Sequence, residues 1–158
     1  MGRSKFNVGD DLEKRSCDGI VFDSIMEMKY YRDVVLPQVE SGSIIHYELQ
    51  KSYELQPKFE RGGRKFLPII YVADFYIEYS NGETEIIDIK GAADSVAKIK
   101  RKMTLYRYPE LKYRWITYVK KFGGWVDYDE VQKLRREAKK ERVNKEDFDH
   151  EQNEEADV

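Results

Sequence analysis

The feature that most constrains the fold is a pair of alternating segments joined by Ser80-Asn81-Gly82, in the stretch IIYVADFYIEYSNGETEIIDIKG. Runs of Ile, Tyr and Phe that alternate with polar residues are typical of β-strands. An Asn-Gly pair between two such runs is typical of a hairpin turn. The sequence therefore predicts an antiparallel hairpin with strands at about 69–79 and 83–90.

The length of the turn decides which residues of the hairpin face one another. A two-residue Asn81-Gly82 turn would put Asp74 and Asp88 on opposite faces of the sheet. A three-residue loop, with Gly82 in the left-handed conformation, sets Asp74 directly across from Asp88. Only this loop gives one apolar and one polar face, as a half-buried sheet requires, so we predict the three-residue loop. The apolar face then holds Tyr71, Ala73, Phe75, Ile77, Tyr79, Ile87 and Ile89, and the polar face holds Asp74, Tyr76, Glu78, Thr84, Ile86, Asp88 and Lys90.

Carboxylates that face each other across a hairpin repel, and like charges in such pairs destabilise a sheet. Positive charge between them would offset the repulsion. Lys90 could supply part of that charge, and a divalent cation could supply more. Because carboxylate oxygens are hard ligands, Mg²⁺ is the favoured ion. The alternative is that Asp74, Asp88 and Lys90 form a charged ladder on a solvated face, with no chemical role.

The remaining segments predict a chain in which helices flank a sheet. A helix should begin near Phe22, with Ser24 as its cap and Glu27 three residues later, and it should end or kink at Pro37. The order helix, strands, helix, strand predicts an α/β sandwich on a mixed sheet. The other expected elements are one or two short strands in 44–59, a mobile basic loop at 61–65, a basic helix at about 95–107, a strand at 113–119 and a charged helix from Asp129 to about Arg142.

The net charge of −2 hides a segregation of charges along the chain. Residues 143–158 hold seven acids against the single base Lys145, whereas residues 98–121 hold nine Lys or Arg against the single acid Glu110. A basic zone beside an acidic tail indicates a polyanionic partner, with the tail competing for the same surface. The alternative is a solvated helix face and a solubilising tail.

Five segments together resemble the PD-(D/E)XK nuclease superfamily, and in particular a family of small phage and prophage endonucleases related to resolvases. They are FDSIMEMKYY, YELQPKF, IIYVADF, IIDIKG and KIKRKM, between about Phe22 and Pro109. Ala73 stands where the superfamily name has proline, but that proline is not a ligand. The resemblance implies a restriction-endonuclease-like sandwich, with a central mixed sheet of about four strands flanked by helices in an αβββαβ core.

The resemblance also implies a metal site that carries catalysis. Asp74 and Asp88 would bind Mg²⁺, or Mn²⁺ as its substitute, together with the backbone carbonyl of Ile89. Glu27 would approach from the first helix, as a further ligand or through a water, or its role would be limited to the helix cap. Lys90 would orient or activate the attacking water and offset charge on the phosphorane.

Basic residues would hold the DNA backbone, without reading its sequence. One of Lys100 and Lys102 would reach the phosphate at the active site, and the other would contact flanking backbone. Gln56 either forms a hydrogen bond near the metal site or is a turn residue before Pro57. The DNA-binding candidates are Lys98, Lys100, Arg101, Lys102, Arg61 and Arg64.

The function implied by the resemblance is a metal-dependent DNA endonuclease that hydrolyses phosphodiester bonds. Because no separate recognition domain is apparent, we expect selectivity for DNA structure, as in a Holliday-junction resolvase acting in phage recombination or replication. The substrate would be branched or duplex DNA, and symmetric cleavage of a junction would need a homodimer. Two alternatives stay open, a non-catalytic nucleic-acid-binding accessory protein on the same fold and an interaction protein that uses its acidic tail.

The domain organisation follows from these assignments. Residues 1–18 are interpreted as a flexible arm, 19–126 as the nuclease domain, and 127–158 as a charged helix followed by an acidic disordered tail. No apolar run could cross a membrane, no nucleotide cofactor is indicated, and the lone Cys17 suits a reducing compartment. We therefore expect a cytoplasmic protein, in the host cytoplasm if it is encoded by a phage.

Overall fold

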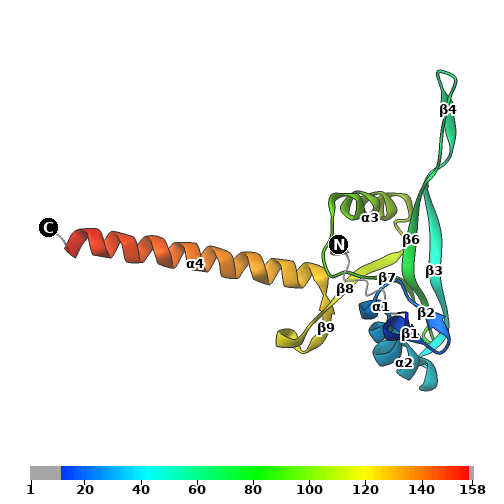
Figure 1. The fold of residues 1–158 in the computed structure, drawn as a ribbon, viewed down its shortest axis with the longest axis horizontal. Helices are drawn as coiled ribbons and strands as arrows, with labels where there is room; N and C mark the ends of the chain where they lie inside the picture. Colours follow the sequence, from blue (N-terminus) through cyan, green and yellow to red (C-terminus); the bar gives the residue numbers. More distant parts are fainter. Residues whose placement is uncertain (1–11, 157–158) are drawn as a thin grey trace.

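A mixed sheet of five strands, in the order β3-β6-β7-β8-β9, forms the centre of the protein (Figure 1). The computed structural model describes the backbone of residues 12–156 and the side chains of residues 12–145. β7 and β8 are parallel, and the other neighbours are antiparallel. This confirms the predicted fold class, with five strands where about four were expected. The strands are β3 (Ile44–Gln56), β6 (Ile69–Tyr79), β7 (Thr84–Ile89), β8 (Lys112–Val119) and β9 (Gly124–Asp127).

The segment before the first helix is partly ordered. A short 3-10 helix (Glu13–Arg15) leads into β1 (Ser16–Cys17), which pairs with β2 (Ile20–Val21). Nη1 of Arg15 donates to the carbonyl of Phe22 at 3.2 Å and ties this segment to the start of the helical layer. Of the flexible arm predicted at 1–18, residues 12–18 contain these short elements, and residues 1–11 lie outside the described part of the chain.

The first helical segment runs further than its proline indicated. It consists of α1 (Ile25–Tyr30), a π-helical stretch (Tyr31–Val35) and α2 (Leu36–Glu40). Pro37 lies at the start of α2, directly after the π-helical stretch, and the chain stays helical through it. Of the two outcomes expected at Pro37, an end or a kink, the helix does not end there, and the segment ends before Gly42, whose φ is +77°.

Two further helices complete the fold. α3 (Ser95–Arg107) has the predicted bounds, and the side chain of Asp94 caps it by accepting from the N–H of Ala97. α4 (Tyr128–Ala156) leaves the sheet and projects away from it (Figure 1). α4 is helical to Ala156 in the described backbone, whereas the sequence indicated a disordered tail after Arg142. In the part of the chain that the structure describes, no helix is long and apolar enough to cross a membrane.

The hairpin of β6 and β7 has the predicted three-residue loop. The N–H of Tyr79 donates to the carbonyl of Glu83 at 2.9 Å, and Gly82 has a φ of +85°. Phe75 pairs with Ile87, in the register that leads to Asp74 and Asp88.

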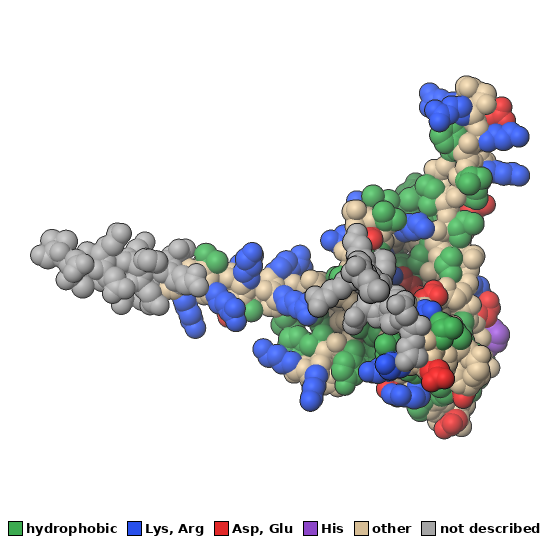
Figure 2. Space-filling model, in the orientation of Figure 1, with side chains coloured by type: hydrophobic (Ala, Val, Ile, Leu, Met, Phe, Trp, Pro, Cys, Tyr) green, Lys and Arg blue, Asp and Glu red, His purple; other side chains and the backbone are tan. Residues whose placement is uncertain are grey.

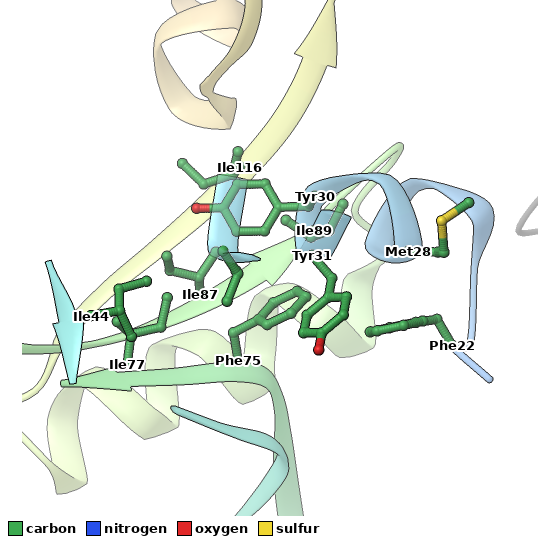
Figure 3. Close-up of a cluster of buried hydrophobic side chains, with 11 residues drawn as sticks. Phe22, Met28, Tyr30, Tyr31, Ile44, Phe75, Ile77, Ile87, Ile89 and Ile116 are labelled. Atoms are coloured by element: carbon green, nitrogen blue, oxygen red, sulfur yellow. The ribbon is translucent and has the colours of Figure 1, made fainter. Parts of the chain in front are cut away.

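The expected division of this hairpin into an apolar and a polar face is wrong, because both faces are covered. Ile86 and Asp88, assigned to the polar face, are 0% and 2% exposed. β7 lies between β6 and β8 at the centre of the sheet, where neither face meets solvent. One core cluster packs against α1 and α2 (Figure 3) and contains Phe22, Met28, Tyr30, Tyr31, Val35, Ile44, Phe75, Ile77, Ile87, Ile89 and Ile116. The other packs against α3 and the start of α4 and contains Leu55, Tyr71, Ala73, Ile86, Tyr113, Trp115 and Tyr128.

Along both β3 and β6, the residues at one end pack in the first core cluster and those at the other end pack in the second. In β3, Leu49 packs on the first cluster and Tyr53 on the second, although both positions are odd-numbered. Gln50 has a φ of +55°, a left-handed conformation that interrupts the alternation of side chains. On β6 the same change separates Phe75 from Tyr71, so these two do not share a face as predicted.

Beyond the sheet, the chain between β3 and β6 forms a projecting arm (Figure 1). Its strands are β4 (Phe59–Arg61) and β5 (Arg64–Phe66), joined by a turn of Gly62 and Gly63. The predicted mobile loop at 61–65 is therefore an ordered hairpin. Its base continues from β3, which is one long strand instead of one or two short ones.

Candidate active site

A cleft of about 1200 Å³ lies where the end of β7 meets α1 and α3. It brings together residues that are far apart in the sequence and that come from both helical layers. The four predicted catalytic side chains line this cleft, together with Ile89 and Lys100. The predicted members are Glu27, Asp74, Asp88 and Lys90.

Asp74 and Asp88 lie one position beyond the last backbone pair of the β6–β7 hairpin. The N–H of Asp74 donates to Oδ1 of Asp88 at 3.2 Å. In return, the N–H of Ile89 donates to Oδ2 of Asp74 at 2.8 Å. Each carboxylate therefore accepts a hydrogen bond from the opposite strand, and this exchange continues the ladder after the two backbones have separated.

Asp88 is held by groups that the sequence did not reveal. The hydroxyl of Tyr71 donates to its Oδ1 at 2.6 Å, and the hydroxyl of Tyr113 donates to its Oδ2 at 2.9 Å. Nζ of Lys90 lies 3.2 Å from the same Oδ2. Burial, followed by the charge of Asp88, raises the pKa of the Tyr113 hydroxyl, so this group remains a donor. Both oxygens of Asp88 are thus occupied.

Asp74 and Glu27 are less well compensated. Burial is the largest cause that raises the pKa of Asp74 well above its usual value, followed by the charges of Asp88 and Glu27. Burial also raises the pKa of Glu27 to about 7, against a hydrogen bond from Ser24 that lowers it. Both shifts mean that the folded protein resists the full negative charge of this group.

Glu27 serves the helix cap and the cleft together. The hydroxyl oxygen of Ser24 accepts from the N–H of Glu27 at 3.1 Å, which confirms the predicted cap of α1. The same hydroxyl donates to Oε1 of Glu27 at 2.9 Å. The cap fixes one carboxylate oxygen, and the side chain still lines the cleft.

The donor chemistry fits a hard cation bound with several waters. Among the residues that the structure describes, no group of three or more His, Cys, Asp or Glu side chains is arranged as a metal site. Within residues 12–145, however, the one hydrogen bond to the carboxylate of Asp74 comes from the N–H of Ile89 and reaches Oδ2, so Oδ1 is available to a cation. Mg²⁺ is typically held by one or two carboxylates and keeps several waters. Asp74 and Glu27 would hold it, and Asp88 would join them only by releasing one of its present donors.

The basic helix α3 divides into residues with different roles. Lys100 lines the cleft, whereas Lys98 and Lys102 are exposed and lie outside it. Arg101 is committed to the fold, because its Nη1 donates to Asp129 at 2.9 Å and its guanidinium lies 4.3 Å from the ring centre of Trp115. A contact of Arg101 with DNA would have to compete with this pairing to Asp129.

The other candidates also separate in space. Arg61 and Arg64 lie on the projecting arm and do not line the cleft. Gln56 pairs with Ile69 at the end of β3 and is likewise absent from the lining.

Two basic residues of the cleft wall, Lys29 and Arg32, were not predicted. Lys29 is two positions from Glu27, a spacing that a helical pattern assigns to another face. The π-helical stretch changes the helical phase at Arg32. Two basic residues that follow Glu27 in the sequence were the only signal, and charge alone does not distinguish them from a solvated helix face.

The fold and the cleft define a small α/β protein with a buried acidic site at the end of β7, the central strand of a mixed sheet. Residues 3–124 match the model of the family described as protein of unknown function (DUF1064), and the chain belongs to this family. No curated protein matches the sequence. The matched range contains every residue that lines the cleft except Trp125, and it ends before α4.

Proposed function

We propose that this protein is a metal-dependent DNA endonuclease that hydrolyses phosphodiester bonds. The observation that supports it most is the charge balance of the cleft. Three buried or half-buried carboxylates, those of Glu27, Asp74 and Asp88, line the cleft, and among the described residues Lys90 forms an ion pair with only one of them, Asp88. Such an arrangement is unfavourable in the protein alone and becomes favourable when a cation binds.

The cleft residues would divide the work as follows. Mg²⁺, when bound, would polarise the scissile phosphate and lower the pKa of a water. Lys90 would place its ammonium beside the negative charge that develops on the phosphate. Glu27, which lines the cleft, would be one of the two carboxylates that hold the ion. Asp74 would hold the ion through its free oxygen.

The rest of the cleft wall supports an anionic substrate. Lys29, Arg32 and Lys100 line the wall from α1, the π-helical stretch and α3. Arg32 is paired with Asp33 at 2.6 Å, so Lys29 and Lys100 are the residues to which we assign backbone phosphates. Contacts of this kind give affinity that depends on salt and carry no sequence information.

We propose branched or duplex DNA as the substrate and phage recombination or replication as the setting. A homodimer would supply the two active sites that symmetric cleavage of a four-way junction requires. Mn²⁺ would substitute for Mg²⁺, since both are hard cations with oxygen ligands.

The test is a cleavage assay on linear, nicked and four-way DNA, with Mg²⁺, with Mn²⁺ or with chelator. We expect metal-dependent cutting that Asp88→Asn abolishes. The matched control is Glu83→Gln, which neutralises an exposed carboxylate in the hairpin loop and should cut normally. Binding without cutting would select the non-catalytic accessory protein, and equal cutting by Asp88→Asn would exclude this cleft as the active site.

A further inference from the structure

The projecting arm of β4 and β5 carries a second basic surface, separate from the cleft (Figure 2). Between Pro57 and Leu67 the chain has four bases against one acid, Glu60. The tip of the arm shows this charge as a group of Lys and Arg side chains (Figure 2). The bases are Lys58, Arg61, Arg64 and Lys65.

The register of the arm sorts its side chains onto two unlike faces. Phe59 pairs with Phe66, and Arg61 pairs with Arg64. Because successive side chains of a strand point to opposite faces, these four residues share one face. The residues between them, Glu60 and Lys65, pair with each other on the opposite face and are of opposite charge.

The face with the arginines has the chemistry of a nucleic-acid contact. Arg61 and Arg64 are exposed cross-strand neighbours of like charge, a pairing that destabilises a hairpin unless an anion lies nearby. Neither has an ion-pair partner among the described residues. Phosphate oxygens are well suited to guanidinium groups, which bind them with two parallel hydrogen bonds.

Two features favour an ordered conformation of the arm. The rings of Phe59 and Phe66 stack with centres 4.6 Å apart and planes 5° apart. Gly62 and Gly63 have φ values of +59° and +71°, which suit the tight turn that matches the twist of a two-stranded ribbon. At about 3.3 Å per residue, the segment from Pro57 to Gly62 extends about 20 Å.

We infer that this arm lies in a groove of duplex DNA and holds the duplex while the cleft acts on it. The major groove, about 12 Å wide, admits a two-stranded ribbon. Arg61 and Arg64 contact the phosphates, and the stacked phenylalanines keep the ribbon rigid. This inference rests on the proposed function for the identity of its ligand.

The experiment measures binding of a fluorescein-labelled 20-base-pair duplex by anisotropy, in chelator, over a series of salt concentrations. Arg61→Gln/Arg64→Gln should weaken binding about tenfold or more and reduce the slope of log K against log salt by about 2. Single-turnover cleavage at saturating protein should not change, because the cleft is intact. Circular dichroism of each variant verifies the fold.

Two adjacent residues of the arm provide the matched control. Arg64→Gln and Lys65→Gln each remove one charge, from opposite faces of the same strand. We expect the first to lose clearly more affinity than the second. Equal losses, or a double variant that binds as tightly as the unmodified protein, would overturn the inference.

The failure of this inference can be distinguished from the failure of the proposed function. If the unmodified protein cuts DNA and the double variant binds DNA with unchanged affinity, only the inference about the arm is overturned. If the double variant loses affinity for DNA but the unmodified protein shows no metal-dependent cutting, only the proposed nuclease activity is overturned. Loss of binding to phosphatidylserine vesicles in the double variant, with no duplex binding by the unmodified protein, would assign the arm to a membrane surface and overturn the inference.

Discussion

Strand β7 carries two buried carboxylates, Glu85 and Asp88, that are each 2% exposed and are surrounded in opposite ways. Glu85 receives two hydrogen bonds from Arg114, at 2.9 and 3.0 Å, and lies 3.8 Å from Nζ of Lys112. The hydroxyl of Tyr79 also donates to it. Around Glu85, cations outnumber the carboxylate.

Around Asp88 the balance is reversed. Its one close cation is Lys90, and two further carboxylates, Asp74 and Glu27, line the same cleft. Burial and residue class are the same for Glu85 and Asp88, so neither property distinguishes a structural carboxylate from a functional one. The difference lies in whether the protein itself supplies the compensating charge. We use that difference as the criterion for the predictions below.

The largest effect is expected for Asp74→Asn, which should lower cleavage at least about a thousandfold, or about 4 kcal/mol in activation free energy. Asparagine can still accept the hydrogen bond from the N–H of Ile89, so the fold is kept. Because the change removes a repelling charge, thermal stability at pH 8 should rise. Cleavage rate and melting temperature are measured side by side, and a loss of both would indicate that Asp74 is structural, like Glu85.

Glu85→Gln should lower the free energy of unfolding by about 3 kcal/mol, because the buried carboxylate loses its charge-assisted hydrogen bonds with the half-exposed Arg114. The measurement is urea denaturation. Glu83→Gln, an exposed change on the same hairpin, should stay within about 0.5 kcal/mol. Cleavage per folded molecule should be normal in Glu85→Gln. A loss of cleavage without a loss of stability would mean that Glu85 is functional, as proposed for Asp88.

The pH dependence of stability should come from the acidic cleft. The carboxyl of Glu27 ionises near 4.5 in the unfolded chain and near 7 in the folded protein, so the folded state binds more protons between these values. Stability without metal should therefore fall by about 3 kcal/mol as pH rises from about 4.5 to 7. Glu27→Gln should flatten this profile in thermal melts, and an unchanged profile would assign the effect to other groups.

The smallest effect is expected from the ion alone. Added Mg²⁺ at 100 times its dissociation constant should raise stability by about 2.7 kcal/mol at pH 8. Asp74→Asn should abolish this gain, whereas Glu85→Gln should keep it. Thermal melts with and without Mg²⁺ measure both, and equal gains in the two variants would mean that the ion binds outside the cleft.

Local chemistry allowed part of this site to be predicted from the sequence. The cap at Ser24, the bounds of α3 and the loop at Gly82 depend on residues a few positions apart. The register of the hairpin follows from that loop, and with it the meeting of Asp74 and Asp88.

What the sequence did not reveal depends on contacts between distant segments. Tyr113 reaches Asp88 from β8, and Arg101 reaches Asp129 across 28 positions, so neither partner has a local signal. The arm was predicted as a loop because its short strands extend from the paired ends of β3 and β6, and that pairing joins segments that are distant in the sequence. Burial of Ile86 likewise required knowing that β8 lies beside β7.

The left-handed residue Gln50 lies between the pairs that flank Asp74, where β3 and β6 pass from one core cluster to the other. The cleft therefore sits at the seam of two separately packed halves, with Glu27 on one side and Lys100 on the other. A bound phosphodiester would link those halves. Amide protons in both would then exchange more slowly together, although the two core clusters of the described residues have no side chain in common.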